Sequence, residues 1–484
     1  MRICKRDRVS RSNRDSLKRW TFRRGDEVVR AYPFASALQP QLAGKFCDEC
    51  MQPLPKTITP ASNRVHLRAH SQGAITIRCP NCPFVNYCSL KCQKIYSEYH
   101  DAVECAMLRE FVPEVPDVTF RLFAKLLYKT HGREFSEFSE NLFTGERRTF
   151  QDLLDHREDI KESPVVHTRF RTYLAFVLHT FPDNLKPDPD RALRVFGRMI
   201  INRFSVQSLY LEPIGEALYI GPSIHDHSCS PDAGFVFDGA LLSIRAGRDL
   251  VVTDPRQIYI CYIDILQTLE DRQSFLKEHY FFRCACPYCT DEQHLINRIS
   301  AVKESIRDSL RGALTACVHG ENESDAVQLD SVYQRARSLI EQDDSDEIAL
   351  GKESTLKFWK IDALAVAFEC AERLPHRRQT EAFKIGLRLL ANFKLTYGEC
   401  RPCVSVLCFR LAVIASEVLS KGNEQNEHEL CQIIKDACTR LLATHGKDHP
   451  LTRRADCLAQ QWPGSRSIIR SFVSHHTSNT TSTH

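Results

Sequence analysis

The stretch CPNCPFVNYCSLKCQKIYSEYHDAVEC, residues 79–105, carries most of a dense group of cysteines. A Cys-x2-Cys pair suits zinc because a tight turn points both thiolates at one ion, and eight ligands are enough for two tetrahedral ions. So short a segment has too small an apolar core to fold alone, and bound zinc would hold it together. The candidate ligands in chain order are Cys47, Cys50, Cys79, Cys82, Cys88, Cys92, His100 and Cys105.

A second group of cysteines follows much later, in Cys284-x-Cys286-x2-Cys289. It supplies only three ligands, whereas a structural zinc ion takes four. The obvious fourth ligand is Cys229, in the segment His227-Ser-Cys-Ser-Pro231. The sequence therefore predicts three structural zinc ions.

The length and composition of the chain limit the classes of protein to which it can belong. The chain has 484 residues, 43% of them hydrophobic and 26% charged, as in a folded soluble protein. That length favours roughly two to four domains. There is no run of about 18 apolar residues, so no membrane span is expected. Residues 1–8 have no apolar stretch behind them, so we expect no secretory signal, and clustered cysteines then indicate metal thiolates rather than disulfides. We expect a monomer in the nucleus or the cytoplasm.

The N-terminal residues 2–24 are rich in Lys and Arg, against only Asp7 and Asp15. Such a basic end could contact nucleic acid or an acidic protein surface. The plainer alternative is a solvated terminal segment that needs no partner. The net charge of the whole chain, +4, favours neither interpretation.

The apolar pattern divides the rest of the chain into helical and strand-like parts. Residues 106–205 and 291–460 have the spacing of helices. Between them, residues 234–245 form two apolar runs around Asp238-Gly239, which predicts a β-hairpin. Residues 257–263 are rich in β-branched and aromatic side chains and predict a further strand.

The first cysteine group resembles a MYND finger in the spacing Cys82-x5-Cys88-x3-Cys92-x7-His100. The resemblance implies two interleaved zinc sites in a module that binds proline-rich peptides. Residues 51–78 are longer than the family has and read as an inserted loop, and the last pair is His-x4-Cys instead of His-x3-Cys. By resemblance, one ion takes Cys47, Cys50, Cys88 and Cys92, and the other takes Cys79, Cys82, His100 and Cys105.

Further motifs extend the resemblance. His227-Ser-Cys229-x-Pro231, the hairpin, Cys261-Tyr-Ile-Asp264 and the last cysteine group look like a SET domain with its post-SET zinc loop. With the early MYND finger and the helical C-terminal part, the layout is similar to the SMYD family, the SET and MYND domain-containing protein lysine methyltransferases.

The SMYD resemblance implies an α+β multidomain fold. A β-rich SET core would carry an inserted zinc-binding MYND finger, a helical insert, a post-SET zinc loop and an all-α, TPR-like helical repeat at the C-terminus. The segments would be 1–46 (N-terminal part of the SET domain), 47–105 (MYND finger), 106–205 (helical insert), 206–266 (SET core), 267–290 (post-SET loop), 291–465 (helical repeat) and 466–484 (disordered tail).

The same resemblance implies transfer of a methyl group from S-adenosylmethionine to a lysine of a histone or another protein. Such an enzyme aligns donor and acceptor and excludes water, and aromatic side chains suit the lysine stem and the developing cation. Tyr262 and Tyr280 would supply hydroxyls at the methyl-transfer pore. The cofactor contacts would be Asn202, Asp226, His227, Tyr262 and Phe282, with Phe282 near the adenine.

These residues also have plainer interpretations. A tyrosine such as Tyr262 in a β-rich strand is more often part of the core, and His227 could be a packed histidine or could hold Cys229 by a hydrogen bond.

The cofactor side departs from the family pattern. Residues 12–17 lack the two glycines that would let the backbone approach the cofactor. Asp226 and Asp232 stand where the family has Asn, and an aspartate near the cofactor's carboxylate repels it unless it is protonated or paired. The alternative function is therefore a weak or inactive SET–MYND scaffold that acts as a transcriptional co-regulator through protein binding.

Overall fold

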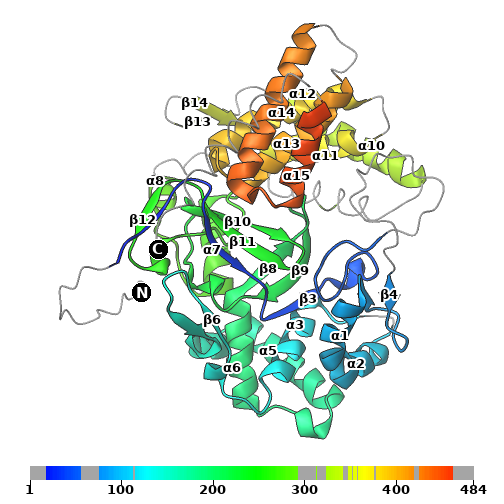
Figure 1. Ribbon diagram of the computed structural model, residues 1–484, viewed down its shortest axis with the longest axis vertical. Coiled ribbons are helices and arrows are strands. Elements are labelled where there is room, and N and C mark those ends of the chain that lie inside the picture. The colour runs from blue at the N-terminus through cyan, green and yellow to red at the C-terminus, as the bar shows by residue number, and fades with distance from the viewer. Residues whose placement is uncertain are drawn as a thin grey trace. The chain divides into compact units, whose positions relative to one another are not determined.

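The computed structural model describes residues 18–55, 76–112, 115–292, 312, 323–341, 347–350, 353–356, 358–374, 378–418 and 424–461. These residues form two compact units (Figure 1). Unit 1 contains the chain up to Ile260 together with Gln273–Cys284, and unit 2 contains Cys261–Arg272 and the chain from Ala285 onward. Segment 12–17, most of the 51–78 insertion and the tail 466–484 lie outside the described residues. Within the described part, no helix combines the length and apolarity needed to cross a membrane.

The sheets of unit 1 join the start of the chain to its middle. Strand β1 (Trp20–Phe22) pairs with β12 (Leu250–Val252). Strand β2 (Glu27–Ala31) is an edge of a sheet of order β10-β11-β2, and β3 (Ala35–Leu38) of one of order β3-β9-β8. All these pairs are antiparallel. The other bounds are β8 Arg203–Gln207, β9 Pro213–Leu218, β10 Ala233–Asp238 and β11 Leu241–Ala246.

The predicted hairpin is confirmed. Asp238 pairs with Leu241, so Gly239 and Ala240 form a two-residue loop between β10 and β11. Gly239 has φ +59, which matches the glycine at the first central position of a type II′ turn. A Cβ at Gly239 would lie 2.3 Å from the Cys50 carbonyl oxygen, so the turn also requires glycine for space.

The predicted strand 257–263 is wrong. The 3-10 helix η7 (Pro255–Gln257) occupies its start, and Ile260 forms only an isolated bridge with His227. The β-branched residues Ile258 and Ile260 are buried without a ladder. β-branched residues favour strands because their side chains pack well when buried. Here the same side chains are buried from a segment of irregular backbone.

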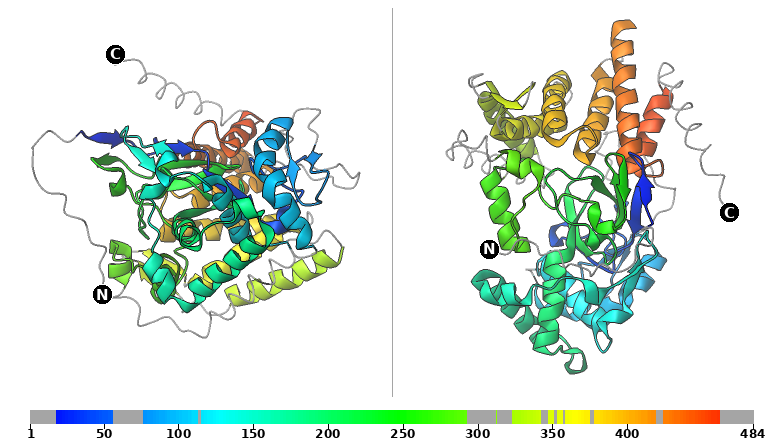
Figure 2. Two further views of the ribbon diagram at one scale, coloured as in Figure 1. Left: turned by 90° about the horizontal axis from the view of Figure 1, so that it is seen from below. Right: turned by 90° about the vertical axis from the view of Figure 1, so that its left-hand side faces the viewer.

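The segment predicted to be helical, 106–205, is mainly helical in unit 1, but the hairpin of β6 (Ser139–Asn141) and β7 (Arg147–Thr149) interrupts it and β8 begins at Arg203. Helix α3 (Val118–Thr130) begins at its N-cap Asp117, whose carboxylate accepts the Phe120 N–H at 3.0 Å. Its buried face includes Phe120 and Phe123 and packs against β3 and α6. Figure 2 shows these helices packed together on one side of unit 1. The other bounds are α4 Arg157–Glu162, α5 Pro164–Thr180 and α6 Pro189–Asn202.

In the described part of the cysteine-rich finger, the main regular structures are one short hairpin and one helical segment. Strands β4 (Ile77–Arg78) and β5 (Asn86–Tyr87) form a short hairpin. Helix α1 (Leu90–Tyr99) passes into a π-helix, η2 (His100–Glu104), and then into α2 (Cys105–Glu110).

Unit 2 consists mainly of helices, each of which contacts the next in sequence. This confirms the helical C-terminal region, although hairpin β13–β14 departs from the expected all-α composition. The helices are α10 Glu323–Glu341, α11 Phe358–Arg373, α12 Gln379–Tyr397, α13 Pro402–Val418, α14 Glu424–His445 and α15 Pro450–Gln461. The strands are β13 Glu347–Leu350 and β14 Glu353–Leu356, and the chain around the last cysteine group forms α7 Leu269–Tyr280 and α8 Pro287–Glu292.

Candidate functional site

The first set of thiols in the finger comes from two loops and one helix. Cys47 and Cys50 lie before the insertion, Cys88 follows β5, and Cys92 lies in the first turn of α1. The Cys88 sulfur lies 3.5 Å from that of Cys50 and 3.6 Å from that of Cys92. Ser89 caps α1 by accepting the Cys92 N–H at 3.2 Å, which fixes Cys88 and Cys92 on either side of the helix start.

These distances fit zinc rather than disulfides. A Zn–S bond of about 2.3 Å places two sulfurs of a tetrahedral site about 3.8 Å apart, whereas a disulfide bond measures about 2.05 Å. All four cysteines are free thiols, and their sulfurs lie within 4.8 Å of one another. The set can therefore hold a zinc ion.

The second set joins the β4–β5 hairpin to the helical segment behind it. His100 Nε2 lies 3.2 Å from the Cys79 sulfur and 3.5 Å from the Cys82 sulfur. The Cys105 sulfur lies 3.8 Å from that of Cys79. All four residues are buried, and their ligand atoms again lie within 4.8 Å of one another. Three thiols and one imidazole are a donor set typical of structural zinc.

The π-helix explains how the His-x4-Cys spacing still forms one site. In an α-helix, with 3.6 residues per turn, a residue five positions after His100 would point away from it. In η2 the Cys105 N–H instead donates to the His100 carbonyl, which is the wider i→i+5 turn of a π-helix. The extra residue is absorbed by this turn, and Cys105 returns to the face of His100.

The third set contains Cys229 and the three cysteines of the last group, Cys284, Cys286 and Cys289. Their sulfurs also lie within 4.8 Å of one another, so the fourth ligand expected from the sequence is in place. His227 Nε2 lies 3.3 Å from the Cys229 sulfur. The imidazole of His227 therefore supports this cysteine, which is the plainer of its two expected roles.

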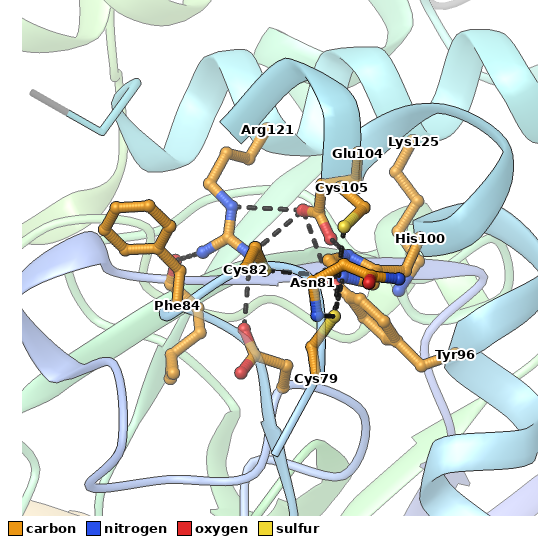
Figure 3. A network of polar contacts seen from close by, with 12 residues as sticks. Cys79, Asn81, Cys82, Phe84, Tyr96, His100, Glu104, Cys105, Arg121 and Lys125 are labelled. Atoms are coloured by element: carbon orange, nitrogen blue, oxygen red, sulfur yellow. Dashed lines mark hydrogen bonds and ion pairs between the residues drawn. The ribbon is translucent and has the colours of Figure 1, made fainter. Parts of the chain in front are cut away.

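The residues missed by the sequence reasoning are those that surround the second set (Figure 3). Glu104 Oε2 lies 3.0 Å from His100 Nδ1, and Glu104 Oε1 accepts from Arg121 Nε and Nη2 at 3.1 and 2.9 Å. Arg121 Nη2 also lies 3.2 Å from Asp48 Oδ1. The His100–Glu104 spacing of one helical turn is visible in the sequence, but the contacts of Arg121 are not.

Burial and charge act in opposite directions on these carboxylates. Burial alone would raise the pKa of Glu104, but Arg121 and His100 outweigh it and hold that pKa at about 2. For Asp48, burial prevails over the attraction of Arg121 and raises the pKa to about 6.

Three of the predicted methyl-transfer residues meet in unit 1. The rings of His227 and Phe282 have centroids 6.0 Å apart, and those of Tyr280 and Phe282 are 6.5 Å apart. Helix α7 ends at Tyr280, and Phe281 then takes a left-handed conformation, φ +61, with its N–H donating to the Lys277 carbonyl. This turn places Tyr280 and Phe282 on the same side of the chain as His227.

Tyr262 is half-buried and lies outside any strand. Two residues before it, Ile260 pairs with His227 in a bridge, and its carbonyl accepts the Ser228 N–H at 2.9 Å. The backbone that leads into Tyr262 is thus tied to the His227 segment.

Asn202 is the last residue of α6, and its side chain is buried. Its amide Nδ2 donates to the Leu154 and Arg198 carbonyls at 3.0 and 2.8 Å. These two bonds brace the α6 C-terminus and leave the Asn202 amide oxygen as the group that could accept from a ligand.

The two aspartates of the predicted cofactor site differ in their surroundings. Asp232 is buried, pairs with the Arg248 guanidinium and accepts the Tyr259 N–H at 3.0 Å, so the expected repulsion from it is cancelled by pairing. Asp226 is exposed. Partial loss of hydration raises the Asp226 pKa, while the charges of Arg148 and Arg256 lower it.

No protein-family model matches the chain. It is 28% identical to histone-lysine N-methyltransferase SMYD3 of Homo sapiens over 298 residues, 60% of this chain and 63% of that protein. It is 29% identical to SMYD3 of Mus musculus over 55% of this chain and 57% of that protein. It is 25% identical to N-lysine methyltransferase SMYD2 of Bos taurus over 89% of this chain and 91% of that protein. The chain thus spans about three fifths of the SMYD3 relatives and nearly all of the SMYD2 relative. These matches, the helical C-terminal region and the three Cys/His sets support membership of the chain in the SMYD family.

Proposed function

We propose that the protein is an S-adenosylmethionine-dependent protein-lysine N-methyltransferase that acts on a histone or another protein and contains three structural zinc ions. The relatives named above carry lysine methyltransferase names, and the three Cys/His sets can hold zinc. The observation that carries the proposal is the meeting of His227, Tyr280 and Phe282 at the end of α7, in a chain of this family.

The residues around Phe282 fit the demands of the reaction. S-adenosylmethionine would supply a methyl group on a sulfonium, which a neutral lysine amine must approach in line. The adenine of S-adenosylmethionine would stack on the half-buried ring of Phe282. The aromatic ring of Tyr280 would desolvate the lysine stem, which lowers the pKa of its amine, and the Tyr280 hydroxyl would orient the amine by a hydrogen bond.

The charge pattern on the cofactor side also supports the proposal. Because Asp232 is paired with Arg248, its carboxylate is not free to repel the carboxylate of an amino acid. Asp226 remains exposed, and the charges of Arg148 and Arg256 offset part of its negative charge.

Cofactor binding is the first test. Titration calorimetry of the zinc-loaded full chain with S-adenosylmethionine should give saturable binding below millimolar concentration. Absence of heat at millimolar cofactor would remove the enzyme proposal.

Transfer of a labelled methyl group to a protein mixture is the second test. Tyr262→Phe should reduce the label incorporated while cofactor binding persists, because only a hydroxyl at the reacting amine is lost. Unchanged incorporation would remove Tyr262 from the catalytic residues.

One observation favours the alternative, an inactive scaffold. Both amide hydrogens of Asn202 are already bonded to backbone carbonyls, as in a residue with a purely structural role. A scaffold would bind protein partners while the calorimetry above shows no cofactor.

The finger would bind protein partners whether the protein is an enzyme or a scaffold. Leu90, at the start of α1, is 73% exposed and offers an apolar contact to a proline-rich peptide. We expect the protein to act as a monomer in the nucleus or the cytoplasm. Titration of a proline-rich peptide should show binding that Leu90→Asp weakens, and equal binding by both proteins would exclude this surface.

A further inference from the structure

A single guanidinium lies between the two metal-binding sets of the finger. Arg121 is on α3, outside the finger, and its side chain is 3% exposed. Its Nη2 lies 2.9 Å from Glu104 Oε1 and 3.2 Å from Asp48 Oδ1, and its Nη1 donates to the Leu38 carbonyl of β3 at 2.9 Å. One Arg121 nitrogen thus contacts two buried carboxylates, and each of these neighbours a different metal-binding set. Figure 3 shows the contact of Arg121 with Glu104 beside the second set.

Glu104 orients the histidine of the second set. Its Oε2 takes the Nδ1–H of His100, which leaves Nε2 as the nitrogen that faces Cys79 and Cys82. The π-turn that admits Cys105 also brings Glu104 alongside His100. A carboxylate on the far nitrogen of a metal-binding histidine fixes the tautomer and the ring orientation.

Asp48 holds together the two ends of the first set. It follows Cys47 directly, and its Oδ2 accepts the Asn86 N–H at 2.9 Å, while its own N–H donates to the Asn86 carbonyl at 2.9 Å. Asn86 lies two residues before Cys88 in β5. Asp48 therefore clamps the Cys47–Cys50 loop to the strand that delivers Cys88.

The two carboxylates depend on the same cation. Glu104 and Asp48 are both 1% exposed, and each raises the pKa of groups around it by its negative charge. Removal of Arg121 would leave two buried carboxylates facing each other without a shared donor, which is the costly case for buried charges. Lys125 adds a favourable charge near Glu104, but its Nζ donates to the Ser36 carbonyl and lies over the Tyr96 ring, 4.2 Å from the centroid.

We propose that Arg121 is a positioning residue shared by both zinc sites of the finger, acting through Glu104 on His100 and through Asp48 on the Cys47–Cys50 loop, so that helix α3 is needed for the finger to retain its ions. The inference rests on the zinc binding proposed above and is independent of methyl transfer.

The test is zinc release from the full chain to a chromophoric chelator, with the sites resolved by cadmium-113 NMR of the exchanged protein. Removal of a side chain that orients a metal ligand typically weakens metal binding about 10- to 100-fold. Arg121→Met should accelerate release from both finger sites by that factor and move both finger resonances. Arg121→Lys, which keeps the charge but not the paired donors, should restore part of the retention.

Substitution of one carboxylate at a time separates the effect of Arg121 through Glu104 from its effect through Asp48. Glu104→Gln should accelerate release from the site with three cysteines and one histidine only, and Asp48→Asn from the four-cysteine site of the finger only. The matched control is Arg198→Met, since Arg198 is a buried arginine of α6 that pairs with Asp155 and donates to the Phe150 carbonyl. It should lower stability and leave zinc release unchanged.

The outcomes are distinct. If the wild-type chain takes up no zinc, the proposed zinc binding fails and this inference fails with it. If the wild-type chain holds its ions and Arg121→Met releases them at the wild-type rate, the inference alone is wrong. If Arg121→Met does not fold, loss of the site selectivity predicted for Glu104→Gln and Asp48→Asn overturns it.

Discussion

His225 and His227 are two residues apart, yet their imidazoles have different tasks. His227 Nε2 faces the Cys229 sulfur. His225 is 2% exposed, and its Nδ1 lies 3.1 Å from the Ile258 carbonyl, to which it donates as a neutral ring. Burial lowers the pKa of His225 to about 4. At this scale the role of each histidine is set by the groups that its ring contacts.

The buried His225 predicts a loss of stability on the acid side. The pKa of His225 is about 4 in the folded chain and 6.5 in an unperturbed histidine, so the unfolded chain takes up the proton first. Stability is therefore complete above pH 6.5 and falls as the pH drops toward 4, with a loss of about 1 kcal/mol by pH 5.5. His225→Asn, whose amide can donate to Ile258 in place of Nδ1–H, should lack this component when urea unfolding is compared at pH 7.5 and 5.5.

A substitution that removes no titratable group, Leu178→Ala, provides the control for that measurement. Leu178→Ala should lose as much stability between the two pH values as the wild-type chain. An identical pH dependence of wild type and His225→Asn would show that His225 does not control it.

Removal of the Tyr280 hydroxyl predicts a selective kinetic defect. Tyr280→Phe keeps the ring that packs near Phe282 but loses the group that would orient the lysine amine. We expect kcat to fall about 10²-fold, within the range of a lost hydrogen bond at the reacting centre, while the cofactor Kd stays the same. Tyr32→Phe, at a residue 72% exposed, should change neither quantity. A Tyr280→Phe enzyme with wild-type kcat would contradict the assignment.

At the scale of elements, two irregular backbone segments place the candidate site residues. The π-helix η2 absorbs one residue and returns Cys105 to His100, and the left-handed Phe281 ends α7 and turns Phe282 toward His227. Phe281 also stacks on His156, with ring centroids 5.5 Å apart. Such departures from regular helices recur at functional sites because they re-aim side chains that a continuous helix would point elsewhere.

The packing of α6 predicts a strong effect from a small substitution. A Cβ at Gly197 would lie 2.0 Å from the Asp155 carbonyl oxygen, and backbone atoms cannot move aside cheaply. Gly197→Ala should lower the free energy of unfolding by about 1–3 kcal/mol, although alanine alone favours a helix by about 1 kcal/mol. Urea unfolding measures this.

A surface substitution on the neighbouring helix provides the comparison for Gly197. Leu178 on α5 is 36% exposed, and Leu178→Ala should change stability by less than Gly197→Ala. A stabilised Gly197→Ala protein would show that the α6 contact is looser than described.

At the scale of the whole molecule, the predicted zinc ions make the finger the part most sensitive to chelation. Structural zinc contributes on the order of 10–16 kcal/mol to the folding of small zinc domains, and residues 47–105 have few strands of their own. Treatment with a strong chelator should expose residues 47–105 to proteolysis while helices α11–α15 of unit 2 stay resistant. Mass spectrometry of the fragments identifies the cleaved bonds, and an unchanged digestion pattern after zinc removal would contradict this prediction.

The features that the sequence predicted correctly are local ones. The Cys-x2-Cys pairs and the Asp238-Gly239 turn were recognisable because each motif is a tight turn defined by residues that are close together in the sequence. Helices α10–α15 followed from apolar periodicity for the same reason. The prediction of a strand over 257–263 was wrong because a strand needs a neighbouring strand to pair with. That neighbour cannot be identified from the residues of the segment itself.

The sequence by itself indicated the resemblance to the SMYD family, the cysteine motifs and most of the helical segments, since each depends on residue types at short spacing. Only the tertiary structure decided which groups support the ligands. Arg121 lies 17 residues from Glu104 and 73 from Asp48, and no pattern in the chain connects them. The tertiary structure also showed that Asp232 is paired with Arg248, which cancels a repulsion that the sequence alone predicted. Which distant charges come into contact depends on how the whole chain packs, so these pairs cannot be identified from local sequence.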